Sequence, residues 1–217
     1  MVVDVVSRLA RLDCCAVSDA LDRLGLPGAV SGIHRLTTTR RISGRVHTVQ
    51  MVHDDGTPSM RHLGTTAIEA SQPGDVIVME QRTGVDAACW GGNLSFGAKL
   101  RHVAGVIVDG PVRDIDEARE YDFPVFARQA TARTARGRIR EAATDVPIVV
   151  GDVSVAPGDY VVADGSGVAF VAQAEIARVL DAAEAIAAKE RAMIAALKDG
   201  SPISTVMGQT YEKMLKE

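Results

Sequence analysis

A Pro-Gly-Asp turn followed by a short apolar run occurs twice in this chain and limits the folds open to it. The two copies are "QPGDVIVME" at 72–80 and "APGDYVVAD" at 156–164. Pro followed by Gly favours a type II turn, in which the glycine has a positive φ. Because the runs behind the turns are rich in apolar and β-branched residues, they indicate strands at 76–80 and 160–163. The fold is therefore expected to contain strands that begin at tight turns.

Further strands and helices are spread along the whole chain. Alternating or β-branched runs predict strands, and apolar residues at three- and four-residue steps predict helices. The expected strands are 41–52, 105–109, 124–127, 147–150 and 153–155, and the expected helices are 17–25, 65–71, 93–102, 114–120 and about 173–199. Ser18 or Asp19 is the expected start signal of the first helix. This density of strands with helices between them indicates a layered α/β or α+β fold, and no linker divides residues 1–217 into two domains.

The composition excludes several classes of protein. With 217 residues, 47% of them hydrophobic, the chain can bury a substantial core. Its net charge of -4 and pI near 5.8 argue against nucleic-acid binding, which depends on neutralising phosphates. The apolar stretches are too short for a membrane span, the first residues lack the pattern of a secretory signal, and three cysteines form no disulfide or zinc pattern. We expect a soluble, cytoplasmic protein without nucleic-acid or membrane partners.

The stretch "GVIVDGPVRD" at 105–114 carries the strongest chemical signal. It predicts a buried strand that stops at a turn and places Arg113 and Asp114 at the rim of a sheet, where sites in layered folds gather. An arginine offers a planar fork of donors to a carboxylate. An aspartate offers an oxygen ligand to Mg²⁺, which takes one or two protein carboxylates. Together they can hold a small 2-oxo acid; the other interpretation is a surface ion pair that caps the turn and opens the helix 114–120.

A pair of glycines precedes another helix in "CWGGNLSFGAKL" at 89–100. The first amides of a helix have no intrahelical partner and carry partial positive charge, which suits a carboxylate or phosphate. Gly91 and Gly92 permit such a group to come close to the backbone. Many Gly-Gly pairs only make a turn, so the pattern alone leaves both interpretations open.

Glu190 is unusual because it lies on the apolar stripe of the predicted helix 173–199. It is either solvated, where the helix has left the core, or directed into a subunit interface or a site. The five histidines show no paired metal spacing and are expected to be structural or exposed. His47 lies in the middle of a predicted strand with His53 and Asp54 just beyond it, so these three are the ones to compare with a pocket. The arginines are expected to form a solvated face over 128–140, at positions 128, 133, 136, 138 and 140.

Five segments, in order and spacing, resemble the RraA-like family, which contains metal-dependent aldolases and the regulator of ribonuclease E activity. They are "VSDALDRLG", "PGDVIVME", "AGVIVDGPVRD", "YDFPVFAR" and "VPIVVGDVSVAPGDYVVADGSGVAFV". The resemblance implies one α/β domain of layered β/β/α type, assembled as a homotrimer or homohexamer with sites between subunits. It also implies a lyase that uses Mg²⁺, or another divalent cation such as Mn²⁺, to cleave a 4-hydroxy-2-oxo acid to pyruvate, with oxaloacetate decarboxylation as a side activity.

The same resemblance implies roles for individual residues. Arg113 binds the substrate carboxylate and Asp114 binds the metal. Gly92, Asn93 and Leu94 hold the substrate at the start of their helix, and Glu190 of a neighbouring subunit contacts metal-bound water.

One position departs from the aldolase pattern. The aldolases have an acidic residue twenty-one positions before the signature arginine, and here that position is Gly92. In the family this acid orders water on the metal, and loss of such a contact typically costs about 10- to 100-fold in affinity or activity. Two alternatives to a standard aldolase therefore remain: the same clamp used for a dehydration or cyclisation, or a non-catalytic regulator that binds a protein partner.

Overall fold

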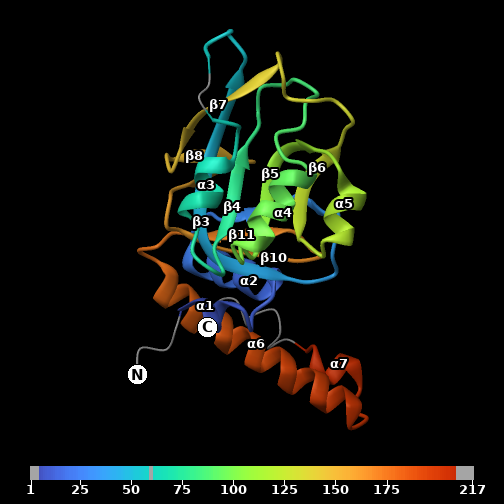
Figure 1. Ribbon diagram of the computed structural model, residues 1–217. Helices are drawn as coiled ribbons and strands as arrows, with labels where there is room; N and C mark the ends of the chain where they lie inside the picture. The colour runs from blue at the N-terminus through green and yellow to red at the C-terminus, as the bar shows by residue number, and fades with distance from the viewer. Residues whose placement is uncertain (1–4, 59–60, 209–217) are drawn as a thin grey trace.

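The computed structural model describes residues 5–58 and 61–208 (Figure 1). The strands are β1 (Ala29–Val30), β2 (His34–Arg35), β3 (Ile42–His53), β4 (Val76–Glu80), β5 (Gly105–Val112), β6 (Val125–Ala130), β7 (Ile139–Thr144), β8 (Ile148–Val150), β9 (Val153–Val155), β10 (Tyr160–Ala163) and β11 (Val168–Val171). The helices are α1 (Val5–Leu9), α2 (Cys14–Leu24), α3 (Thr65–Ala70), α4 (Gly92–Leu100), α5 (Ile115–Glu120), α6 (Ile176–Lys198) and α7 (Ile203–Val206). The mixed α/β class predicted from the sequence is confirmed.

The long strand β3 connects two differently paired parts of one curled sheet. Its first residues, 42–45, pair antiparallel with β10, whereas residues 46–50 pair parallel with β4. The order in the described part of the chain is β1-β11-β10-β3-β4-β5-β6-β2, with β7 on the far end of β3, and β8 and β9 form a separate hairpin. Because β3 belongs to both parts, the sheet bends over itself and encloses a core.

The central parallel strands β4 and β5 are buried on both faces. Alternation along β4 directs Ile77 and Met79 toward the cluster that contains α3, α4 and α5. Val76 and Val78 point to the opposite face, where they pack with residues of β8, β9 and β10. The parallel register aligns the carboxyl ends of β4, β5 and β6 at one edge. Sites in open α/β sheets form at this edge.

The helices α1, α2 and α6 form the outer layer beneath β10 and β11 (Figure 1). Leu21 of α2 and Leu180 of α6 are buried there against Val162 and Ala169. The second half of α6 runs on past this layer and α7 lies beside it (Figure 1). None of the helices in the described residues has both the length and the apolar composition needed to cross a membrane.

Both Pro-Gly-Asp turns have the expected geometry. Gly74 and Gly158 have φ values of 91° and 89°. In each turn the aspartate side chain also accepts a hydrogen bond from the amide three residues earlier. Asp75 accepts from Gln72 at 2.7 Å and Asp159 from Ala156 at 2.8 Å. The aspartate is thus part of the turn, which explains why the two tripeptides have the same third residue.

The predicted start of the first long helix was wrong. Helix α2 begins at Cys14, and its N-cap is Asp13, whose carboxylate accepts a hydrogen bond from the Ala16 amide at 2.8 Å. Ser18 and Asp19 lie in the second turn. Asp13 precedes two cysteines rather than an apolar periodic run, so the usual start pattern was absent. The predicted stop at Gly25 is confirmed by its left-handed backbone.

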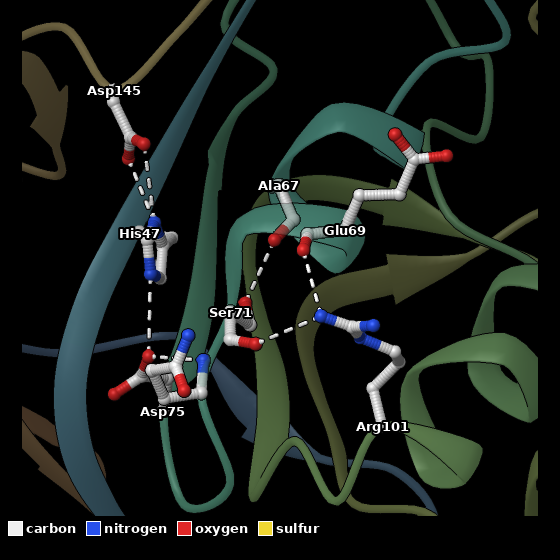
Figure 2. Close-up of polar contacts among 8 residues, drawn as sticks. His47, Ala67, Glu69, Ser71, Asp75, Arg101 and Asp145 are labelled. Atoms are coloured by element: carbon white, nitrogen blue, oxygen red, sulfur yellow. Dashed lines mark hydrogen bonds and ion pairs between the residues drawn. The ribbon is translucent and has the colours of Figure 1, made fainter.

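His47 has a structural environment (Figure 2). Its Nδ1 lies 3.0 Å from Asp145 and its Nε2 lies 3.2 Å from Asp75, so the ring connects the middle of β3 to the first Pro-Gly-Asp turn and to the β7–β8 connection. The expectation that this histidine is structural is confirmed by these contacts.

We expect Asp159→Ala to destabilise the fold. Asp159 is buried and accepts hydrogen bonds from the amides of Ala156 and Gln173. Its removal leaves two backbone donors without an acceptor, which costs about 1–3 kcal/mol for each buried group. Urea unfolding followed by circular dichroism measures the change, and Asp152→Ala, at an exposed position, is the control. Equal stability of the two variants would contradict this role.

Candidate active site at the end of β5

The candidate site is a cleft at the carboxyl end of β5. All eight residues of β5 are buried, and the strand runs to Val112, three residues beyond the predicted end. The segment 88–90 lies beside it, since Cys89 donates to the Pro111 carbonyl and Arg113 donates to the Trp90 carbonyl. The cleft measures about 130 Å³ and is lined by His62, Leu63, Ala88, Cys89, Trp90, Gly91, Gly92, Asn93, Leu94, Arg113, Asp114, Thr134, Ala135 and Arg136. The structure therefore brings together the predicted residues 92–94, Arg113 and Asp114.

Asp114 has a strained backbone at the centre of this cleft. Its φ of 58° and ψ of 42° are left-handed, a conformation that costs non-glycine residues free energy and is typical of functional sites. Although Asp114 is the N-cap of α5, its side chain makes no capping bond to that helix. Instead, Oδ2 accepts hydrogen bonds from the Gly92 amide at 3.0 Å and from Arg113 Nε at 3.2 Å. The ion pair that the sequence allowed is present. The Asp114 carboxylate, however, is hydrogen-bonded to the first amide of α4 and does not cap α5.

The two glycines allow this contact. A Cβ on Gly91 would lie 2.6 Å from Asp114 Oδ2, and a Cβ on Gly92 would lie 1.8 Å from Glu117 Oε2. Carboxylates of α5 therefore occupy the space that side chains at 91 and 92 would take. Here the Gly-Gly pair does more than turn the chain, because it forms a cradle at the first turn of α4.

The amides at the start of α4 face the same cleft. The N-cap Gly91 has no side chain to accept from them, and within the described residues only the Gly92 amide has a side-chain acceptor. Asn93 is exposed, whereas the Leu94 side chain is buried in the core, so Leu94 can contribute only its backbone. Trp90 Nε1 donates to Ser95 Oγ at 2.9 Å, which fixes the loop in front of the helix. The amides of Asn93 and Leu94 are therefore available for a carboxylate or an enolate oxygen.

The donor set suits a magnesium ion better than a transition metal. Among the described residues no three His, Cys, Asp or Glu side chains converge. Asp114 and Glu117 supply two carboxylates at the cradle, and within those residues Asp114 Oδ1 receives no hydrogen bond. Mg²⁺ is usually bound by one or two carboxylates, with water and substrate oxygens completing its shell. The residues present therefore fit the cation that the sequence suggested.

Three residues near the cleft were missed by sequence reasoning: His62, Glu117 and Arg136. Arg136 was assigned to a solvated face, but residues 131–136 return over the end of β5 because Thr131 donates to the Val112 carbonyl. Glu117 lies in a second, open hollow that shares Arg113 and Asp114 with the cleft. Nothing in the local pattern pointed to these positions, since their proximity depends on how loops and helices meet in space.

Glu190 lies outside the cleft of its own chain. It is partly buried on α6, and this burial together with the negative charges of Asp13 and Asp19 raises its pKa. It therefore faces the start of α2. A role in the site of a neighbouring subunit stays a prediction.

The fold and the cleft define a mixed α/β protein with an arginine, a carboxylate and free helix amides gathered at one sheet edge. Comparison with known proteins agrees, because the model of the RraA-like family (Aldolase/RraA) matches residues 14–170. This chain belongs to that family.

Individual relatives cover most of the chain. A protein of Halalkalibacterium halodurans, named "Putative 4-hydroxy-4-methyl-2-oxoglutarate aldolase", is 31% identical over 91% of this chain and 90% of its own length. An uncharacterized protein of Pseudomonas syringae has a similar structure, with a TM-score of 0.84, 30% identity and coverage of 94% and 96% of the two chains. RraAS2 of Streptomyces coelicolor, described as an unusual member of the RNase ES inhibitor RraA family, has a TM-score of 0.76 with 28% identity over 83% of this chain and 90% of its own. The chain also matches DlpA of Legionella pneumophila but spans only 32% of that protein's length.

Cys89 lines the cleft, but we expect it not to be a reactive thiol because it is buried. Burial raises the pKa of Cys89 to about 12 and also raises that of Cys14, so both remain protonated near neutral pH, whereas Cys15 is exposed. We expect a thiol-specific disulfide reagent at pH 8 to label one of the three cysteines in the native protein and all three after denaturation. Peptide mapping should locate the native label at Cys15. Rapid labelling of Cys89 would contradict this interpretation.

Proposed function

We propose that this protein is a divalent-metal-dependent lyase that cleaves a small 2-oxo acid to release pyruvate. The observation that carries the proposal is the cradle in which Asp114, held in a strained backbone, lies beside Arg113 at the free amides of α4. The family, and the aldolase name of the Halalkalibacterium relative, support the reaction class. Among residues 5–58 and 61–208 no lysine lines the cleft, and the proposed mechanism therefore uses a metal rather than a Schiff base.

In the proposed mechanism Arg113 binds the carboxylate of the 2-oxo acid through its guanidinium group. Asp114 would hold Mg²⁺ or Mn²⁺, and the bound cation would supply Lewis-acid polarisation of the keto group. The distal hydroxyl loses its proton to water, the carbon–carbon bond breaks, and its electron pair remains on the pyruvate enolate. The amides of Asn93 and Leu94 donate hydrogen bonds to the negative oxygen that develops, and protonation of the enolate carbon gives pyruvate. Arg136, at the mouth, can pair with a second carboxylate of the substrate.

We expect Arg113→Ala to reduce pyruvate release strongly. Hydrogen bonds to a charged group contribute about 1.5–3 kcal/mol, which corresponds to about a 10- to 100-fold loss in kcat/KM. Pyruvate formed from 4-hydroxy-4-methyl-2-oxoglutarate or oxaloacetate is measured by coupling to lactate dehydrogenase, with Mg²⁺ present or chelated by EDTA. Arg133→Ala is the matched control, because that side chain is exposed in the neighbouring loop and pairs with Asp86.

The pyruvate assay separates the alternatives when binding of Mn²⁺ and of pyruvate is measured alongside it. Binding of Mn²⁺ and pyruvate without any product would favour a dehydration or cyclisation at the same clamp. Absence of both cation binding and product would favour a regulator that binds a protein partner, a function suggested by the description of the Streptomyces relative.

We further propose that the protein assembles as a homotrimer or homohexamer, with the far half of α6 and α7 in the interface. The far half of α6 projects past the outer layer together with α7 (Figure 1). Ile194, Ile203 and Met207, in this part of the chain, are exposed. Ile194→Glu is expected to lower the assembled mass measured by light scattering, since it places a charge on a surface that must lose its water. Ala177→Glu, which adds the same charge at an exposed position in the first half of α6, is the control. An unchanged mass for Ile194→Glu would contradict the interface.

A further inference from the structure

Glu117 occupies the space above Gly92. The ideal Cβ position on Gly92 lies 1.8 Å from Glu117 Oε2, 2.8 Å from its Cδ and 3.3 Å from the Cβ of Asp114. No side chain at position 92 can coexist with the carboxylate of Glu117 in this position. Glu117 can therefore hold this position only because residue 92 has no side chain.

The carboxylate of Glu117 has no partner among the described residues. Asp116, its neighbour on α5, forms an ion pair with Arg119 at 2.9 Å. Glu117 is exposed and accepts no hydrogen bond or ion pair from residues 5–58 and 61–208. It nevertheless lies against Gly92, the residue whose amide donates to Asp114 Oδ2. Two adjacent carboxylates repel each other, and the positive end of α4 offsets only part of that repulsion.

We propose that Glu117 is a positioning residue of the candidate site and supplies, from α5, the second negative charge beside Asp114. Its carboxylate accepts hydrogen bonds from water that hydrates a divalent cation held at Asp114. This inference rests on the proposed function and explains how the site keeps two carboxylates although position 92 is a glycine. A purely structural role is the competing explanation, because an acid in the first turn of α5 also stabilises that helix.

The first experiment compares Glu117→Gln with Glu120→Gln. Both changes remove one exposed carboxylate from α5, but only Glu117 lies at the cradle. Free Mn²⁺ is titrated by electron paramagnetic resonance, and fluorescence of Trp90, the one tryptophan in the chain, reports on the cleft independently. We expect Glu117→Gln to weaken Mn²⁺ binding by about 10- to 100-fold, as for losses of residues that orient metal ligands. Glu120→Gln should remain within about twofold of the wild type, the scatter expected for a surface change.

The second experiment is rescue by Gly92→Asp in the Glu117→Gln background. A carboxylate introduced on α4 replaces the lost charge at the cradle and should restore most of the Mn²⁺ affinity. In both backgrounds the new side chain must displace the flexible end of residue 117. The wild type keeps the Glu117 carboxylate, so there the same change should alter affinity little. If Glu117 only stabilises helix α5, a new carboxylate on α4 does not restore the Mn²⁺ affinity.

The outcomes distinguish this inference from the proposed function. If wild type binds Mn²⁺ and releases pyruvate in an Arg113-dependent way, but Glu117→Gln behaves like Glu120→Gln, the inference is wrong and the lyase stands. Loss of affinity without rescue by Gly92→Asp also overturns it. If the wild type does not bind Mn²⁺, the proposed function fails and this inference fails with it.

Discussion

The contact between the Asp114 carboxylate and the Gly92 amide is the constraint on which the candidate site depends. It joins the start of α5 to the start of α4, two helices that follow different strands of the sheet. Asp114 must adopt a left-handed backbone to reach across, which costs on the order of 1–3 kcal/mol. The buried strand β5 and the bonds between 88–90 and 111–113 hold the chain in place around it. A rigid sheet edge thus sustains a conformation that a free loop would abandon.

Much of this frame follows from local patterns. The Pro-Gly-Asp turns, the apolar strands behind them and the long helix α6 have periodicities or turn residues that act within a few positions, so the sequence predicts them. The double role of β3 was not visible, because its change of partner between residues 45 and 46 depends on which strands fold back to it. The strands β1, β2, β7 and β11 were missed as well, since each contributes little pattern of its own.

The candidate site also contains residues that local patterns predicted and residues that only tertiary packing brings to it. Arg113 and Asp114 follow a buried strand, so the sequence predicted them at a sheet edge. Gly92 to Leu94 were recognised as the start of a helix and were assigned to the same site only through the family resemblance. Glu117 and Arg136 come from elements whose side chains meet the cleft only through tertiary packing. Gly92 shows the limit most clearly. From sequence it indicated a missing charge, whereas the structure fills the same space with a carboxylate from another helix.

The openness of the cleft bears on the role predicted for Glu190. Arg113 and Asp114 are 41% and 32% exposed in the single chain, so water screens the charges that the proposed reaction uses. Chemistry through an enolate benefits from excluding this water, which a neighbouring subunit laid over the cleft would do. Glu190 faces Asp13 and Asp19 at the α2–α6 contact and does not reach the cleft of its own chain. A role for it in the reaction therefore requires that this acidic face meet the cleft of another copy, where a shared cation would relieve the repulsion among the three acids.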